Sequence, residues 1–201
     1  MQIKTTEQLR SLYTQPAARA LNKELNYIDH HIERFIGFSP FLVIASSNAQ
    51  LHMDASPRGG MPGFARVLDK HTLLIPDALG NNRLDTLENI LATGQVGLLF
   101  FIPGVDEMVR INGYATLDTD DTLLALFEGQ QNKIRLVINV TVNAAYMHCA
   151  KAAMRSGLWK PERHLERSAL PTMGQLIKEH AKLDGPAETK DDMLKRYEKE
   201  L

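Results

Sequence analysis

The sequence predicts a mainly β protein of the α+β class: a small antiparallel barrel of about six strands with helices packed outside it. Three observations lead to this prediction. Runs of apolar and alternating residues follow one another at hairpin spacing between positions 41 and 149. One short amphipathic segment interrupts them, and helical periodicity returns near the two ends of the chain. Antiparallel strands joined by short turns tend to close on themselves, because closure removes unpaired edges.

The expected strands differ in pattern. Residues 41–47 and 96–103 are continuous apolar runs, as in strands buried on both faces, whereas 108–118 alternates between apolar and polar residues. Residues 64–69 and 71–77 are separated by almost nothing, which indicates a tight hairpin. The remaining expected strands are 51–56 and 134–149.

Helices are expected before, within and after this β region. Residues 83–93 are the inserted helix, and residues 28–37 place isoleucines and a phenylalanine on one face. Thr6 is expected to cap the first helix, Pro16 to open the second and Gly37 to end the third. The other helical segments are 5–13, 16–25, 120–128, 172–180 and 189–200.

The composition is that of a soluble globular domain. The 201 residues are 44% hydrophobic and 23% charged, and 23 basic against 24 acidic side chains give a formal net charge of -1. Nucleic-acid binding usually needs a clear excess of basic residues, so nucleic acid is not an expected partner. The single Cys149 excludes an intrachain disulfide and a zinc cluster built on cysteines. Without an apolar leader or a run of roughly 20 apolar residues, we expect a cytoplasmic protein with no membrane partner.

The stretch from 54 to 91 carries the strongest functional signal. It reads as strand, Gly/Pro loop, strand, tight turn, strand, polar turn and helix, and it contains Arg58, Arg66 and Arg83. A helix N-terminus beside an arginine suits a phosphate, because the terminal N–H groups and the guanidinium both bind its oxygens.

Simpler interpretations of the same stretch stay open. Asn81 or Asn82 could cap the helix while Arg83 is solvated. Residues 56–60 could be an ordinary Gly/Pro turn, and Arg66 could extend along its strand to the surface.

A second group of candidate residues follows the last strand, in the segment 148–159. Lys151, Arg155 and Trp159 combine positive charge with an indole, which suits a flat anionic ligand; the alternative is two solvated cations and a core tryptophan. The seven histidines lack the spacing of a metal-binding helix, so no metal site is expected.

Five segments together resemble the pyridoxamine 5'-phosphate oxidase-like, FMN-binding split-barrel superfamily, and in particular its branch of FMN-dependent proteins. Their order and spacing carry the resemblance, which covers residues 40–159. The segments are DASPRGGMPGFARVLD (54–69), TLLIPDALGNNRLDTLENIL (72–91), VGLLFFIPG (96–104), VRINGYATL (109–117) and HCAKAAMRSGLW (148–159).

The resemblance implies a single FMN-binding domain over 1–201, with N-terminal helices in 1–38, a six-stranded split barrel in 40–159 and a helical extension in 160–201. It also implies a homodimer that binds FMN in clefts between the subunits. The backbone of the strand Arg66-Val67-Leu68-Asp69 would run along the flavin ring, beside Ile75 and Pro76. The phosphate would be held by Asn82 and Arg83 together with Ser56 and Arg58. The flavin would be approached from the other subunit by Met108, Lys151, Arg155 and Trp159.

The function that the resemblance implies is a flavin-dependent oxidoreductase acting on a small-molecule substrate, with NAD(P)H as a candidate reductant. One alternative is a carrier of FMN or haem without turnover, and another is pyridoxamine 5'-phosphate oxidase itself. Three departures weaken vitamin B6 as the substrate: Asp69 or Lys70 replaces a basic residue of the oxidase, Met108 replaces a glutamine, and no C-terminal pyridoxal-phosphate segment is present. No side chain stands out as a required catalytic acid or base.

Overall fold

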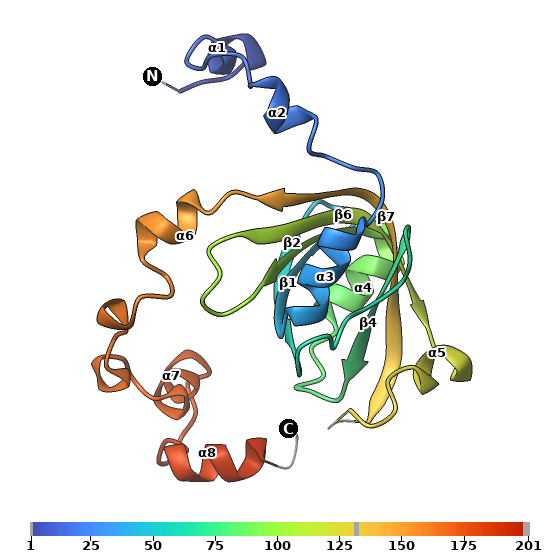
Figure 1. Ribbon diagram of the computed structural model, residues 1–201. Helices are drawn as coiled ribbons and strands as arrows, with labels where there is room; N and C mark the ends of the chain where they lie inside the picture. Colours follow the sequence, from blue (N-terminus) through green and yellow to red (C-terminus); the bar gives the residue numbers. More distant parts are fainter. Residues whose placement is uncertain (1, 131–132, 199–201) are drawn as a thin grey trace.

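The β-rich part of the chain forms one antiparallel sheet, seen in a computed structural model that describes residues 2–130 and 133–198 (Figure 1). Its order is β2-β1-β5-β6-β7-β4-β3. The strands are β1 (Phe41–Ser47), β2 (Met53–Gly59), β3 (Arg66–Asp69), β4 (Thr72–Ala78), β5 (Gln95–Phe101), β6 (Met108–Asp118) and β7 (Ile134–His148).

The mainly β fold with flanking helices is confirmed, but the expected six-stranded barrel is instead a sheet of seven strands that stays open. The two edge strands, β2 and β3, are not hydrogen-bonded neighbours. Both edges are poor partners for a further ladder. Pro57 in β2 lacks a backbone N–H, and β3 is only four residues long with a register shift between Val67 and Asp69.

The strand boundaries follow the hydrophobic patterns closely where one face is clearly buried. The predicted strands 41–47 and 108–118 agree with β1 and β6, and the hairpin of β3 and β4 is confirmed. The predicted strand 51–56 begins and ends later, as β2, because Asn48 and Leu51 form the turn that precedes it. That shift moves residues 56–59 from a supposed loop into an edge strand.

Helices are present at most predicted positions, but several are shorter. They are α1 (Thr6–Arg10), α2 (Ala18–Leu21), α3 (His30–Phe38), α4 (Asp85–Thr93), α5 (Asp121–Ala125), α6 (Lys151–Ser156), α7 (Met173–His180) and α8 (Lys190–Tyr197), with 3-10 turns η1 (Pro161–Arg163) and η2 (Arg167–Ala169). The segment after β7, read as the tail of a strand, is therefore a short helix. The last predicted helical residues, 199 and 200, lie outside the described residues.

Three predicted helix boundaries were wrong. Thr5, not Thr6, caps α1, because its hydroxyl accepts the backbone N–H of Gln8. Helix α2 starts after Ala17 and is not opened by Pro16. Helix α3 continues through Gly37 to Phe38, and the buried Ser39 follows it.

Helices α3 and α4 pack into one hydrophobic core with the sheet. Helix α3 buries Ile32, Phe35 and Ile36 and contacts β3, β6 and β7. Helix α4 buries Leu87 and Ile90 and contacts β1, β2, β5 and β6. These contacts fix the end of α4 that leads into the turn from β4.

Helix α4 is also attached to the sheet by buried polar contacts. Thr86 Oγ1 donates to Asp54 Oδ2 at 2.6 Å, and Asn89 Nδ2 donates to Ser46 Oγ at 3.0 Å. Thr86 is only 2% exposed and Asn89 8%. Satisfied polar contacts at such burial specify orientation, because any displacement of the helix would leave a buried polar group unpaired.

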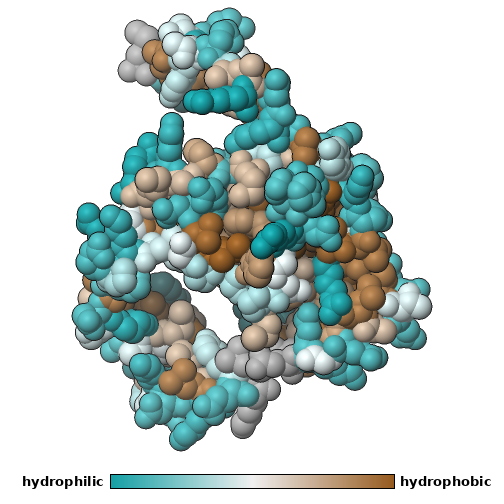
Figure 2. Space-filling model, in the orientation of Figure 1, coloured by the Kyte–Doolittle hydropathy of each residue, from teal (hydrophilic) through white to brown (hydrophobic). Residues whose placement is uncertain are grey.

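The two ends of the chain project from the sheet (Figure 1). The C-terminal helices form an arm, and Figure 2 shows an opening between this arm and the barrel. Within the described ranges, no helix has the length and apolar character that a membrane crossing requires.

Candidate functional site

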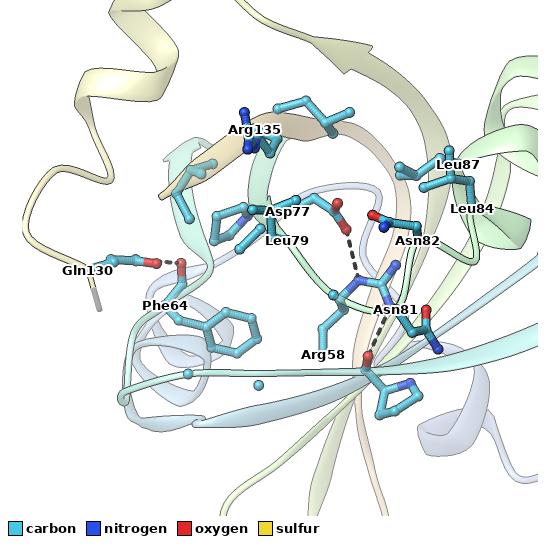
Figure 3. Close-up of a pocket in the computed structure, with 18 of the residues that line it drawn as sticks. Arg58, Phe64, Asp77, Leu79, Asn81, Asn82, Leu84, Leu87, Gln130 and Arg135 are labelled. Atoms are coloured by element: carbon cyan, nitrogen blue, oxygen red, sulfur yellow. Dashed lines mark hydrogen bonds and ion pairs between the residues drawn. The ribbon is translucent and has the colours of Figure 1, made fainter. Parts of the chain in front are cut away.

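A cleft of ≈990 Å³ lies where the open sheet brings β2 near the end of β4 (Figure 3). Its walls come from the end of β2 and the loop after it, from the turn between β4 and α4, and from the start of β7. Among the described residues that line it, the charged side chains are three arginines and one aspartate: Arg58, Arg83, Arg135 and Asp77. The cleft therefore carries a net positive charge, which favours an anionic ligand.

Arg58 spans the split in the sheet. Its Nε lies 3.4 Å from Asp77 Oδ1, so the ion pair joins the edge strand β2 to β4 without a backbone ladder (Figure 3). Its Nη1 donates to the carbonyl oxygen of Pro57 at 2.9 Å. The Nε atom is buried and has no acceptor in hydrogen-bond geometry within the described chain. A buried donor of this kind suits an added acceptor atom.

The interpretation of residues 56–60 as a Gly/Pro loop was wrong for 56–59, which belong to β2, and the strand explains why Arg58 points into the cleft. Asp54, Ser56 and Arg58 alternate with exposed residues along β2 and share its inner face. The side chain of Ser56 is engaged within that row, donating to Asp54 Oδ2 at 2.8 Å.

The two aspartates beside Arg58 have opposite electrostatic environments. Burial raises the pKa of Asp77, and the positive charge of Arg58 only partly opposes this effect. For Asp54, burial is the largest single effect, but hydrogen bonds from Thr86 and Ser56 together with Arg58 outweigh it and lower the pKa. Asp54 is thus a stable anion under the cleft, whereas the charge on Asp77 is the more easily lost.

The turn between β4 and α4 places Asn82 and Arg83 at the cleft. Asn82 has a φ of 56°, and the Asn81 side chain accepts the backbone N–H of Arg83 at 2.9 Å. Asn81 and Asn82 do not cap α4, because Leu84 is the N-cap residue and makes no side-chain cap bond. The side-chain oxygen of Asn81 instead accepts its hydrogen bond before the helix begins, in a local Asx-type turn.

Arg83 itself is exposed. Its Nε pairs with Asp85 Oδ2 at 2.8 Å, and its side chain is 77% exposed. Asp85 and Glu88 both lie in the first turn of α4, so the positive end of that helix is already compensated. The arginines, more than the helix N-terminus, therefore supply positive charge to the cleft.

Arg135 is a cleft residue that the sequence interpretation missed. It lies at the start of β7 next to Leu136, which pairs with Asp77 in β4. The available signal was a basic residue in an apolar strand, but nothing local indicated that β7 would lie beside β4.

The predicted flavin strand is β3, next to β4 at the sheet edge. Arg66 lies over the Phe127 ring, 5.5 Å from its centroid, and does not line the cleft. Leu68 has no pairing partner at the register shift between Val67 and Asp69, and 52% of its surface is exposed. An unpaired, bulged backbone at a sheet edge is available for hydrogen bonds to a ligand.

Two predicted residues of β4 face opposite environments. Ile75 is completely buried in the core and does not line the cleft. Pro76 lines the cleft. Arg58, Pro76, Asn82 and Arg83 are thus the predicted residues that the structure brings together.

Met108, Lys151, Arg155 and Trp159 lie at the opposite end of β7. Met108 pairs with His148, whereas the cleft end of β7 begins at Ile134, roughly 45 Å away along the strand. The indole N–H of Trp159 donates to the carbonyl oxygen of Val105 at 2.9 Å, which folds the segment after α6 against the β5–β6 connection. One chain therefore does not bring this group to the arginine cleft.

No group of three histidine, cysteine, aspartate or glutamate side chains suited to a metal ion occurs in the part of the chain that the structure describes.

By its fold and cleft, this chain is an open antiparallel barrel protein with a cationic cleft at the split. The chain is a member of the pyridoxamine 5'-phosphate oxidase family, whose model matches residues 28–149. A search of curated proteins found no match.

Several solved structures are similar to the chain at low sequence identity. A variant of HupZ from Group A Streptococcus superimposes with a TM-score of 0.50 at 16% identity, covering 60% of this chain and 99% of that one. An FMN-binding protein from Syntrophomonas wolfei gives a TM-score of 0.41 at 11% identity, covering 58% and 83%. HutZ, the heme storage protein from Vibrio cholerae, gives 0.42 at 12% identity, covering 58% and 91%.

Proposed function

We propose that the cleft binds FMN and that the protein is an FMN-dependent oxidoreductase. The observation that carries this proposal is the approach of Arg58, Arg83 and Arg135, from three separate elements, to one cleft that has Asp77 as its one acidic lining residue among those described. A phosphate dianion is the ligand group that such an arrangement of guanidinium groups binds best.

The described residues fit FMN in shape as well as charge. The cleft volume of ≈990 Å³ lies at the upper end of the range for small-molecule sites, about 300–1,000 Å³. Phe64, Leu84 and Leu87 give it an apolar wall for a ring system. Arg58 adds positive charge to the cleft, while its Nε faces Asp77 at 3.4 Å.

Each part of the site has a separate task in this proposal. The bound flavin supplies hydride transfer, and the protein supplies binding and orientation. Arg58 and Arg83 would neutralise the phosphate, and the ring would extend from the cleft to the unpaired backbone at Leu68, which lies outside the lining residues.

We further propose a homodimer in which the second subunit completes the site. Met108, Lys151, Arg155 and Trp159 lie too far from the cleft to share a flavin with Arg58 in one chain. Exposed apolar residues in the C-terminal arm offer contact surface for a second copy; Leu165 is 66% exposed and Leu170 56%. A symmetric dimer would place each far group against the partner's cleft.

Flavin binding is tested directly with the purified protein. Its absorption spectrum and a titration with FMN, followed by flavin fluorescence, should reveal a stoichiometric complex. Absence of flavin bands together with no uptake of added FMN would overturn the proposal.

Turnover needs a separate measurement. Rapid mixing of the FMN complex with NADH or NADPH should bleach the flavin absorbance if the protein is an oxidoreductase. A bound flavin that neither nicotinamide reduces indicates a carrier. Release of pyridoxal phosphate from the amine substrate would instead identify the vitamin B6 oxidase.

A further inference from the structure

Among the described residues that line the cleft, one comes from outside the barrel. Every other residue that lines it lies between positions 57 and 136, inside the span matched by the family, whereas Tyr197 comes from α8 near the end of the described chain. Helix α8 stands apart from the sheet in the C-terminal arm (Figure 1). Tyr197 therefore forms the outer wall of a cleft whose inner walls belong to the barrel.

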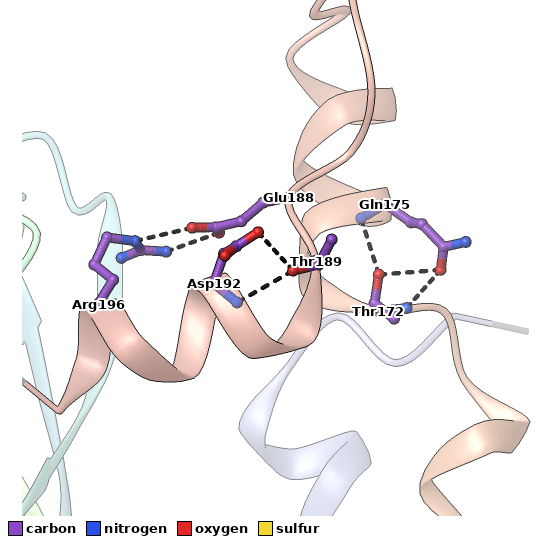
Figure 4. Close-up of polar contacts among 6 residues, drawn as sticks. All are labelled: Thr172, Gln175, Glu188, Thr189, Asp192 and Arg196. Atoms are coloured by element: carbon purple, nitrogen blue, oxygen red, sulfur yellow. Dashed lines mark hydrogen bonds and ion pairs between the residues drawn. The ribbon is translucent and has the colours of Figure 1, made fainter.

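Helix α8 is held in a defined hairpin with α7. Gly174 in α7 packs directly against the backbone of Glu188, leaving no space for a side chain at that position. Thr189 caps α8, and its hydroxyl accepts the backbone N–H of Asp192 at 3.1 Å (Figure 4). The hairpin thus fixes where α8 begins.

The Tyr197 ring is fixed at the other end of the same helix. Arg196 forms two hydrogen bonds with the Glu188 carboxylate, at 3.0 and 3.2 Å (Figure 4). The guanidinium carbon of Arg196 lies 4.9 Å from the centroid of the Tyr197 ring. A cation held over an aromatic face restricts the ring, so Tyr197 is positioned before any ligand arrives.

The position of this ring has a consequence for ligands that extend beyond one phosphate. FMN ends at its phosphate, whereas FAD continues from that phosphate into a second phosphate and an adenosine. With the phosphate at Arg58 and Arg83, the strands and the β4–α4 turn wall the cleft on the side of the barrel, so we expect the adenylate to extend away from them. Tyr197 is the described lining residue that does not belong to those walls.

We propose that Tyr197 is a specificity-determining residue that selects FMN over FAD, an inference that rests on the proposed flavin function. The ring blocks the path of the adenylate. Its hydroxyl supplies one more donor at the cationic cleft.

The test compares FMN and FAD dissociation constants, measured by flavin fluorescence, for the full chain and three variants. The wild type binds FMN more tightly than FAD. In Tyr197→Ala the ratio of the FAD dissociation constant to the FMN dissociation constant falls about tenfold, because removal of the ring opens the path of the adenylate. Tyr197→Phe keeps the ring and keeps the preference. Leu194→Ala, on the same helix but away from the cleft, is the matched control and also keeps it.

The outcomes distinguish the role of Tyr197 from the proposed binding of FMN. An unchanged FMN preference in Tyr197→Ala, or equal binding of FMN and FAD by the wild type, overturns the role of Tyr197 and leaves FMN binding intact. Binding of neither flavin by the wild type overturns both. Far-UV circular dichroism of each variant shows whether the hairpin helices are retained.

Discussion

The two ends of β7 differ in what they offer a ligand. The end near Ile134 meets β4 and β2 and forms a cleft in which Arg58 and Asp77 are paired and largely buried, with side chains 22% and 18% exposed. The end near His148 leads into α6, where Lys151 and Arg155 are exposed. The first end is organised by the fold of a single chain. The second presents exposed cations beside an indole whose N–H is bonded to Val105, and we propose that this surface serves another copy of the chain.

Mixing two complementary variants should give the largest effect on flavin binding. It tests whether the two ends of β7 form one site across a dimer. Arg58→Ala damages the cleft, and Arg155→Ala damages the far group without disturbing the fold, since Arg155 is exposed. In a mixed dimer of the two variants, one site carries both defects and the other carries none. We expect flavin binding to return on mixing, measured by FMN fluorescence. Two weak binders that stay weak after mixing would mean that the two ends act separately.

Arg58→Ala alone should give the next largest effect. Loss of a charged hydrogen bond to phosphate weakens FMN affinity by about 1.5–3 kcal/mol. The same change removes the cationic partner of Asp77 at a partly buried site, so the melting temperature should also fall. Adding Asp77→Asn should restore stability but not FMN affinity. Recovery of both properties in the double variant would contradict a phosphate role for Arg58.

The pH dependence should distinguish the two aspartates of the cleft end. Because burial raises the pKa of Asp77 in the folded state, its contribution to stability is present below the ordinary carboxylate value of about 3.9 and is lost as pH rises through the raised pKa. Asp77→Asn should remove that loss and flatten the stability curve between those two values. Chemical denaturation at a series of pH values measures it. A curve that is identical in the variant would show that Asp77 does not titrate there.

Asp54 should behave in the opposite sense. Its pKa is lowered in the folded state, so its contribution to stability is present above the ordinary carboxylate value and is lost as pH falls through the lowered pKa. The Asp77→Asn variant retains Asp54, so the remaining acid sensitivity of that variant should come in part from this group.

Arg83→Ala should give the smallest effect. Its side chain is 77% exposed and its partner Asp85 is 49% exposed, so solvent screens the pair. We expect a change of only a few-fold in FMN affinity, clearly less than for Arg58→Ala, and little change in melting temperature. A loss as large as that of Arg58→Ala would show that Arg83 turns inward when phosphate binds.

The sequence indicated most of the strands because their side-chain patterns are local. The alternation over 108–118 and the apolar run at 41–47 each report the burial of one segment, and both agree with the structure. The end of β2, with Arg58, was misread as a loop, because proline and glycine usually mark turns and an edge strand is the exception that tolerates them. The candidate arginines were found in part. Arg58 and Arg83 reach the cleft, but Arg66 lies over Phe127, and Arg135 was not considered.

Taken alone, the order of residues determined the antiparallel hairpins, the inserted helix and the presence of arginines suited to phosphate, because hydrophobic period and residue chemistry are properties of short segments. Only the tertiary structure decided which arginines meet, that the sheet stays open between β2 and β3, and that Tyr197 closes the cleft. Those outcomes depend on how far a long sheet curls and on contacts between residues far apart in the chain, and no local pattern encodes such distances.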